Sequence, residues 1–166
     1  MLKEERHMEK YKVILVDDEI EAIQAMEHKM DWDGLGFEVS GSATNGVKAL
    51  ELVENIQPDV VITDIKMPYM NGLELSRRLN DEYRNVHIII FTGFDEFDYA
   101  KEAVHLEIDE YMLKPINAVE LSECLKRVKN SLDKEREEKL EKARANAKPG
   151  SLASKANMVK NFNENK

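Results

Sequence analysis

Five short segments that read as strands alternate with segments of helical periodicity, and this alternation restricts the fold more than any other feature of the chain. We expect strands at 11–16, 37–43, 60–62, 86–91 and 108–113. Apolar residues recur at helical spacing in 20–30, 47–56, 73–79 and 95–106, and Asn117 opens a last, long helix. Apolar strands separated by helices predict a doubly wound α/β fold, with a five-stranded parallel sheet and helices on both faces.

Polar residues stand at the ends of four of these strands. Asp17-Asp18 follow the first strand, Asp64 follows the third, Thr92 ends the fourth and Lys114 follows the fifth. Doubly wound folds hold their sites outside the carboxyl ends of the strands. We therefore expect these side chains to converge at one edge of the sheet.

The three aspartates are the candidate metal ligands. Carboxylates that lie close together repel one another and raise each other's pKa, and Mg²⁺ relieves that repulsion because it binds oxygen ligands. Taken singly, Asp17 or Asp18 could equally be a helix-capping residue, since acids favour helix amino termini. The set of three at converging strand ends favours the metal site.

Two residues beside the aspartates could bind an anion. Lys114 could pair with a carboxylate or with a bound phosphoryl group, although most lysines at strand ends are plain surface residues. The Thr92 hydroxyl could donate to an incoming oxyanion, with Gly93 leaving room, although a glycine here could simply form a turn. The Lys114-Pro115 bond is a candidate cis peptide, because X-Pro bonds adopt this form at low cost.

Four motifs in this order resemble the receiver domains of two-component response regulators. They are Val16-Asp17-Asp18-Glu19, Thr63-Asp64-Ile65-Lys66-Met67-Pro68 with Gly72 four residues on, Phe91-Thr92-Gly93, and Tyr111-Met112-Leu113-Lys114-Pro115. Each motif is weak by itself, but the four in the right order and spacing are specific, and the resemblance covers about 11–132. The sequence of 31–46 and of 92–97 also resembles receivers that are fused to AraC-type DNA-binding domains.

The resemblance implies a phosphoryl-transfer site. Asp64 would be the acceptor and would attack the phosphohistidine of a sensor histidine kinase to form an acyl phosphate. Mg²⁺ would be bound by Asp18, Asp64 and the backbone carbonyl of Lys66. Asp17 would act through a bound water, and Lys114 would pair with the phosphoryl oxygens.

The resemblance also implies a signalling switch rather than a turnover enzyme. Thr92 would move toward the phosphoryl group, and Tyr111 would rotate into the space that Thr92 leaves. The face formed by the fourth helix, the fifth strand and the fifth helix would change shape as a result. The output would be transcription, through a DNA-binding domain that is absent from this chain.

Three other functions compete with this interpretation. A phosphatase of the haloacid-dehalogenase class would need an aspartate two residues after the nucleophile, where Lys66 stands. A flavodoxin-like cofactor binder would need a phosphate loop after Val16, where the acids would repel a flavin phosphate. A degenerate receiver that acts only as an interaction module stays open, although the acceptor-site residues are all present.

Charge and composition suggest how the chain is divided. Residues 133–166 contain 9 Lys and Arg against 6 Asp and Glu, while residues 1–132 contain 15 against 27, which disfavours DNA binding by the globular part. We expect a tag or leader at 1–9, the receiver domain at 10–132, a helical linker extension at 133–148 and a flexible tail at 149–166. A single cysteine, Cys124, and no signal peptide or membrane-length apolar run favour a cytoplasmic protein. A homodimer through the 121–132 helix or the switch face stays open.

Overall fold

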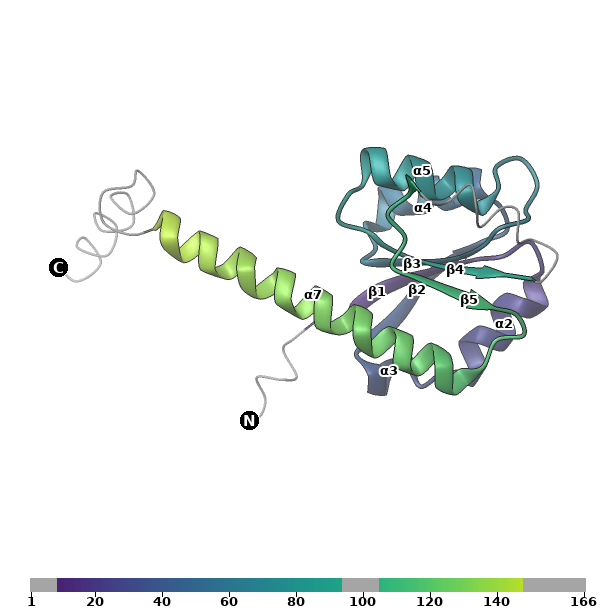
Figure 1. The fold of residues 1–166 in the computed structure, drawn as a ribbon, viewed down its shortest axis with the longest axis horizontal. Coiled ribbons are helices and arrows are strands. Elements are labelled where there is room, and N and C mark those ends of the chain that lie inside the picture. Colours follow the sequence, from purple (N-terminus) through teal and green to yellow (C-terminus); the bar gives the residue numbers. More distant parts are fainter. Residues whose placement is uncertain (1–8, 94–104, 148–166) are drawn as a thin grey trace. The chain divides into compact units, whose positions relative to one another are not determined.

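The computed structural model describes residues 9–93 and 105–147 of the chain, and it contains a parallel sheet of five strands. The strands are β1 (Tyr11–Val16), β2 (Phe37–Ala43), β3 (Val60–Asp64), β4 (His87–Thr92) and β5 (Glu110–Leu113). They lie in the order β2-β1-β3-β4-β5 (Figure 1). Because β1 and β3 are hydrogen-bonded neighbours, the loops that follow them meet at the carboxyl edge of the sheet.

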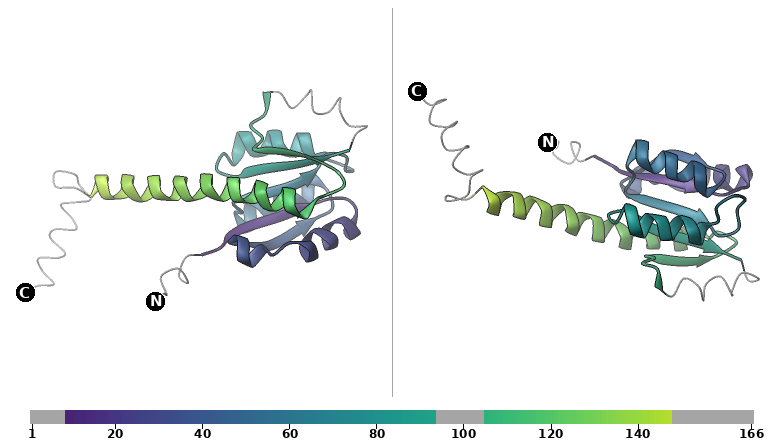
Figure 2. Two further views of the ribbon diagram at one scale, coloured as in Figure 1. Left: turned by 60° about the horizontal axis from the view of Figure 1, so that its bottom comes forward. Right: turned by 90° about the horizontal axis from the view of Figure 1, so that it is seen from above.

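Helices cover both faces of this sheet. They are α2 (Ile20–Lys29), α3 (Trp32–Leu35), α4 (Gly46–Ile56), α5 (Gly72–Glu82) and α7 (Ala118–Asn146). The helices α4 and α5 lie on one face, and α2 and the first turns of α7 lie on the other (Figures 1 and 2). The predicted doubly wound fold, with a five-stranded parallel sheet and helices on both faces, is confirmed.

Asparagines begin the helices that follow β2, β3 and β5. The side-chain oxygen of Asn45 accepts the Lys48 N–H at 2.9 Å, and that of Asn71 accepts the Glu74 N–H at 2.9 Å. Asn117 accepts in the same way from Glu120, at 3.0 Å, at the start of α7. Each bond satisfies one of the N–H groups that a helix start leaves without a partner, so the sequence fixes where the chain turns from strand to helix.

The inner strands β1, β3 and β4 are mostly apolar and buried, because both faces of the sheet are covered there. One cluster of buried residues packs between the sheet and the helices α4 and α5; it comprises Ile14, Val16, Ala43, Ala49, Val53, Val61, Ile65, Leu73, Leu75, Leu79, Ile88 and Ile90. Val13 and Ile62 are also fully buried, and they point to the opposite face because successive strand residues alternate. Leu121 and Leu125 of α7 are fully buried as well.

The structure differs from the sequence prediction at some boundaries. A one-turn helix, α3, stands between the predicted helix at 20–30 and the predicted strand at 37–43, where no element was expected. Asp31 caps its start at 3.1 Å, and Gly36, with φ of 92°, ends it. β3 continues to Asp64, and β5 begins at Glu110 rather than 108. Of the helix predicted at 95–106, residues 95–104 lie outside the described residues.

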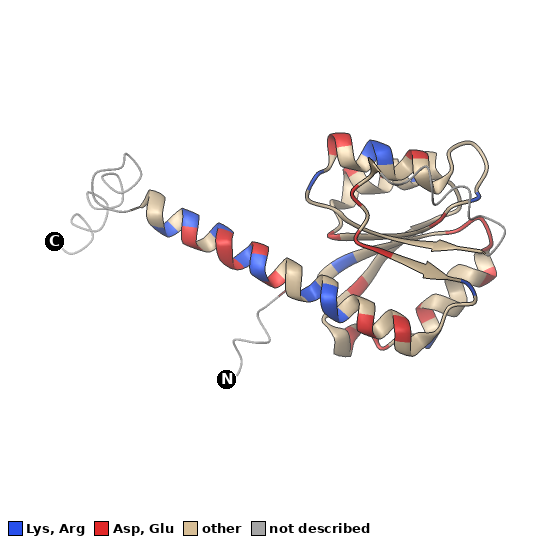
Figure 3. Ribbon diagram, viewed as in Figure 1, with Lys and Arg blue, Asp and Glu red and all other residues tan. Residues whose placement is uncertain are grey.

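The chain divides into two compact units within α7, residues 1–128 and residues 129–166. In the second unit, α7 continues to Asn146 with side chains of both charges along it (Figure 3), and Lys129 Nζ lies 2.9 Å from Asp133 Oδ2. The predicted division into a receiver at 10–132 and a helical extension at 133–148 stays a prediction, as do the tag or leader and the tail. In the described part of the chain, no helix is both long enough and apolar enough to cross a membrane.

Candidate functional site

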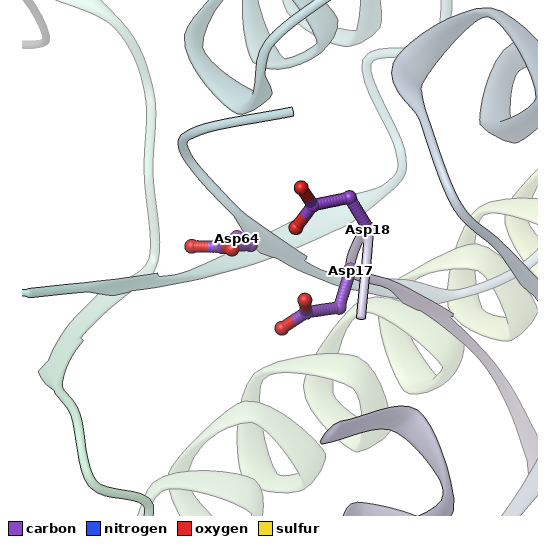
Figure 4. Close-up of side chains that lie close together, drawn as sticks. All are labelled: Asp17, Asp18 and Asp64. Carbon is purple, nitrogen blue, oxygen red and sulfur yellow. The ribbon is translucent and has the colours of Figure 1, made fainter. Parts of the chain in front are cut away.

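Three aspartates lie together at the carboxyl edge of the sheet. Asp17 and Asp18 follow β1, and Asp64 is the last residue of β3. A carboxylate oxygen from each lies within 4.8 Å of the other two (Figure 4). Asp17 and Asp64 are 2% and 4% exposed, whereas Asp18 is exposed. The structure thus brings together the three acids that the strand ends predicted.

The acid cluster is electrostatically strained. The pKa of Asp17 is raised from 3.8 to about 6, chiefly by burial and further by the charges of Asp64 and Asp18. The Glu19 N–H, which donates to Asp17 Oδ1 at 2.9 Å, and the ammonium of Lys114 oppose this rise. These donors only partly offset the cost of holding the charges together, and a bound cation would relieve the remainder.

Lys114 is the positive partner of the cluster. Its Nζ lies 3.0 Å from Asp64 Oδ2 and 3.6 Å from Asp17 Oδ2. The peptide bond to Pro115 is cis, as the sequence suggested. The Lys114 N–H donates to the Thr92 carbonyl at 2.9 Å, so the residue is attached to the end of β4 as well.

Thr92 and Tyr111 occupy the strand positions that the resemblance assigns to the switch. Thr92 ends β4 and is 7% exposed, and its hydroxyl lies 3.2 Å from the Gly93 carbonyl, to which it donates. Tyr111 lies on β5, where its backbone pairs with Ile90, and its side chain is 40% exposed. Partial burial raises the pKa of the Tyr111 phenol. Their roles in switching stay predictions.

The backbone around Asp64 is closely packed. The Ile65 N–H donates to Asp64 Oδ1 at 2.8 Å, which orients the carboxylate, and the Thr63 hydroxyl donates to the Asp64 carbonyl at 2.8 Å. The Gly72 N–H donates to the Ile65 carbonyl at 2.8 Å. A Cβ atom at residue 72 would lie 2.0 Å from the Asp64 carbonyl oxygen, so only glycine allows α5 to begin this close to the strand end.

Sequence reasoning missed three features of this edge. Tyr69 has a positive φ of 69° in the β3–α5 loop. The Gly46 N–H donates to the Met70 carbonyl at 3.1 Å, which joins this loop to the start of α4. A cavity of about 200 Å³ lies between α2 and the segment after β5, beside Lys114. None of these has a local sequence signal, because each depends on contacts between separate segments or on one unusual backbone angle.

The fold and the site define a doubly wound α/β domain with an acid cluster and a paired lysine at the carboxyl edge of its sheet. A protein-family model described as the response regulator receiver domain matches residues 13–126. The chain therefore belongs to the response regulator receiver domain family, as the four motifs suggested.

Relatives agree with this assignment. The chain is 40% identical over 118 residues to the uncharacterized transcriptional regulatory protein YesN of Bacillus subtilis (strain 168), which covers 71% of this chain and 32% of YesN. It is similar to the solved REC domain of AraT, a response regulator from Geobacillus stearothermophilus, with a TM-score of 0.73, 38% identity and coverage of 76% of this chain and 98% of that one. It is also similar to a two component transcriptional regulator AraC from Clostridium phytofermentans ISDg, with a TM-score of 0.71, 26% identity and coverage of 76% and 98%.

The curated relatives are longer than this chain. The chain spans 32% to 48% of the length of those it matches first. What it shares with them is the receiver domain.

Proposed function

We propose that Asp64 is the phosphoryl acceptor of this receiver domain, which acts as a signalling switch. The observation that carries the proposal is the ion pair between Lys114 Nζ and Asp64 Oδ2, 3.0 Å apart, beside two further carboxylates. The hydrogen bond from the Ile65 N–H fixes the orientation of the Asp64 carboxylate. A nucleophile with a fixed orientation and an adjacent cation suits transfer of an anionic phosphoryl group, because the lysine can follow the charge to the product.

The residues at this edge fit a divalent cation with oxygen ligands. Three carboxylates reach within 4.8 Å of one another, and the pKa of Asp17 is raised chiefly by its burial and in part by the charges of Asp64 and Asp18. A cation beside the carboxylates would offset both effects. We propose that Asp18, Asp64 and the Lys66 carbonyl hold Mg²⁺, with Asp17 acting through a water. When bound, the cation supplies positive charge that offsets the negative charge of the transferring group.

The reaction forms one bond and breaks one. An oxygen of Asp64 attacks the phosphorus of a phosphohistidine on a sensor histidine kinase. The oxygen–phosphorus bond forms while the phosphorus–nitrogen bond breaks, and the imidazole leaves. Lys114 exchanges part of its pairing with Asp64 for pairing with the phosphoryl oxygens, and the Thr92 hydroxyl donates to another of these oxygens.

The backbone hydrogen bond between Lys114 and Thr92, which joins the ends of β5 and β4, supports a switch that involves both residues. Because the Lys114 N–H donates to the Thr92 carbonyl, a displacement of one strand end acts on the other. Tyr111, at 40% exposure, lies partly outside the core before the switch and rotates inward when Thr92 moves. The face formed by β5 and its flanking helices then changes shape, which is a population shift driven by new charge-assisted contacts.

The names of the relatives support a transcriptional output. YesN is named a transcriptional regulatory protein, and one structural relative is named a two component transcriptional regulator AraC. We propose that DNA is contacted only through an AraC-type output domain outside this chain, and that the protein acts in the cytoplasm. A homodimer through the switch face or α7 stays a prediction.

Intact-mass spectrometry after incubation with acetyl phosphate, with and without Mg²⁺, tests the acceptor. We expect one Mg²⁺-dependent phosphoryl adduct on the wild type and none on Asp64→Ala. Asp81→Ala is the matched control, because Asp81 is an exposed aspartate in the last turn of α5, and it should be labelled like the wild type.

The degenerate receiver is the second candidate function. It would leave well-folded wild-type protein without any adduct at saturating acetyl phosphate and Mg²⁺. That result would remove the acceptor role from Asp64, and the face around β5 would then be tested for a binding partner.

A further inference from the structure

We infer that residues 129–146 of α7 form a single helical spacer, which is held by pairs of opposite charges and has no second helix packed against it. The spacer belongs to the second compact unit, residues 129–166, and works independently of the proposed phosphoryl acceptor. With a rise of about 1.5 Å per residue, it is about 27 Å long. Its exposure, its charge pattern, its composition and its continuity with a packed helix each support this role.

The last turns of α7 bury no face in the described part of the chain. Every residue from 137 to 146 is exposed, which amounts to almost three turns of helix. The helix α5, with 11 residues, buries five of them, among them Leu73, Leu75 and Leu79. A helix that is polar on all sides is stable only when it bridges solvent or is supported by many charge pairs along its surface.

The sequence of the spacer does not suit a coiled coil with a second copy. Helices that supercoil need apolar residues at two positions of every seven. The spacing of Leu125, Val128 and Leu132, continued along α7, reaches only charged and polar residues: Glu135, Lys139, Lys142 and Asn146. Leu140 is the one large apolar residue in 133–146, and it is 53% exposed. A second copy would therefore bury little apolar surface here.

Opposite charges at helical spacing take the place of a packed face. Side chains of both charges follow one another along this part of α7 (Figure 3). Residues four apart are neighbours on a helix surface, and Lys129 Nζ lies 2.9 Å from Asp133 Oδ2. Three further pairs of opposite charge have this spacing: Lys134–Glu138, Glu135–Lys139 and Glu138–Lys142. Only two pairs of like charge have it, and both involve Glu137, so the balance favours the helix.

The spacer also does not have to begin a helix by itself. Starting a helix is the costly step, because the first turn orders several residues for one hydrogen bond. The first turns of α7 are held by the buried side chains of Leu121, Leu125 and Val128, so the spacer only prolongs an existing helix. Residues 129–146 contain no glycine, proline or β-branched residue, all of which lower helix stability.

A helix and a flexible linker of the same length separate their ends differently. A flexible linker samples a broad range of end-to-end distances, whereas a helix has one distance that its rise sets. The spacer therefore keeps whatever is joined to residue 146 about 27 Å from residue 129. Its charge pairs lie in water, so high salt weakens them.

Pulsed electron spin resonance on the whole chain measures the end-to-end distance. Nitroxide labels are attached to the double variant Ser131→Cys with Ala145→Cys, since both positions are exposed and the buried Cys124 does not react. The positions are 14 residues apart, so we expect one narrow distance of about 21 Å. A flexible segment of this length has a similar mean distance, and the width of the distribution is therefore the readout.

Charge variants of the labelled protein test what holds the helix. Lys139→Glu combined with Lys142→Glu turns two opposite pairs into pairs of like charge, and it should roughly double the width and lower the helical signal in circular dichroism. Lys139→Arg combined with Lys142→Arg is the matched control; it keeps both charges and should behave like the wild type. Glu137→Lys turns both pairs of like charge into opposite pairs, and it should raise the helical signal.

Three results would overturn the spacer. A broad distribution in the wild type would show that the segment is flexible. A glutamate variant as narrow as the arginine variant would show that the charge pairs do not hold the helix. Protein that carries only the Ala145→Cys label should show no coupling between molecules, and a short intermolecular distance would place a second helix beside the first.

Discussion

Aspartates at the two edges of the sheet have opposite environments. At the amino edge, Asp59 and Asp109 precede β3 and β5, and their carboxylates accept backbone N–H groups of neighbouring strands. The Lys12 N–H donates to Asp59 Oδ2 at 2.8 Å, and the Ile88 N–H donates to Asp109 Oδ2 at 2.7 Å. His87 Nδ1 lies 2.8 Å from Asp109 Oδ1. These acids satisfy donors at the strand starts, and so they stabilise the fold.

At the carboxyl edge, the acids face one another instead. Asp17, Asp18 and Asp64 place carboxylate oxygens within 4.8 Å, and the pKa of Asp17 is raised to about 6. An arrangement of this kind makes the folded protein less stable than a neutral one would be. On the proposed function, the difference teaches that charge at the amino edge serves folding, whereas charge at the carboxyl edge serves a ligand.

Gly72→Ala should have the largest effect, and it tests whether the carboxyl edge is rigid. The new Cβ would lie 2.0 Å from the Asp64 carbonyl oxygen, a backbone atom at the carboxyl end of the middle strand. We expect a loss of about 3 kcal/mol or more in the free energy of unfolding, measured with urea. Gly41→Ala is the control, because its Cβ would meet only side-chain ends, that of Ile56 at 3.0 Å and that of Leu52 at 3.4 Å, and no backbone atom. Equal losses in the two variants would show that the edge can relax.

Asp109→Ala should be the next largest effect, and it tests the amino edge. The change leaves the Ile88 N–H and the His87 ring without their carboxylate, so we expect a loss of about 2 kcal/mol in urea unfolding. Asp81→Ala, on the exposed surface of α5, should change stability by about 0.5 kcal/mol or less. Labelling of folded Asp109→Ala by acetyl phosphate should match the wild type. If Asp109→Ala left the free energy of unfolding unchanged, the acids at the amino edge would not stabilise the fold, and the contrast with the carboxyl edge would be lost.

Asp17→Asn should change stability in the opposite direction. Because the pKa of Asp17 is raised, its charged form is unfavourable in the folded protein at pH 7.5, and the neutral amide still accepts the Glu19 N–H. We expect a gain of about 1 kcal/mol in urea unfolding with EDTA present. Added Mg²⁺ should then stabilise the wild type more than the variant. A loss of stability in EDTA would show that the cluster is not repulsive.

The smallest effect should come from Cys124. This residue lies in α7, at neither edge of the sheet, and so serves as an internal reference for the comparison. Burial, with a smaller contribution from Glu110, raises the pKa of its thiol to about 12 from 9.0. Above pH 9 the thiol ionises more readily in the unfolded chain than in the folded protein. The stability that the buried thiol contributes is therefore complete below pH 9 and is lost as the pH rises toward 12. The stability difference between the wild type and Cys124→Ala should therefore shrink by about 1 kcal/mol from pH 7.5 to 9.5. A stability difference that stays constant over this pH range would contradict the prediction.

The sequence predicts what adjacent residues and strand topology decide. The bounds of β2 agree with the prediction, because turn residues flank this segment on both sides. Asp17, Asp64 and Lys114 could be placed together because the carboxyl ends of parallel strands meet at one edge. This rule predicts which residues meet but no distances between them. The ion pairs of Lys114 could therefore be found only in the structure.

Features that depend on contacts between distant segments could not be predicted. The Asn80 side chain accepts the Glu107 N–H at 2.7 Å and donates to its carbonyl at 3.2 Å, across 27 residues of chain. The left-handed backbone of Tyr69 could not be predicted either, because a tyrosine gives no sequence signal for a positive φ. The helix α3 was missed because two glycines suggest a break unless the cap from Asp31 is known.

Lys114 combines two tasks in one residue. Its ammonium contacts the Asp64 carboxylate at 3.0 Å, while its backbone N–H holds the end of β4 through Thr92 at 2.9 Å. On the proposed function, the same residue would therefore contact the phosphoryl group and act on the end of β4. The lifetime of a single covalent bond, the acyl phosphate, would then set how long the output lasts.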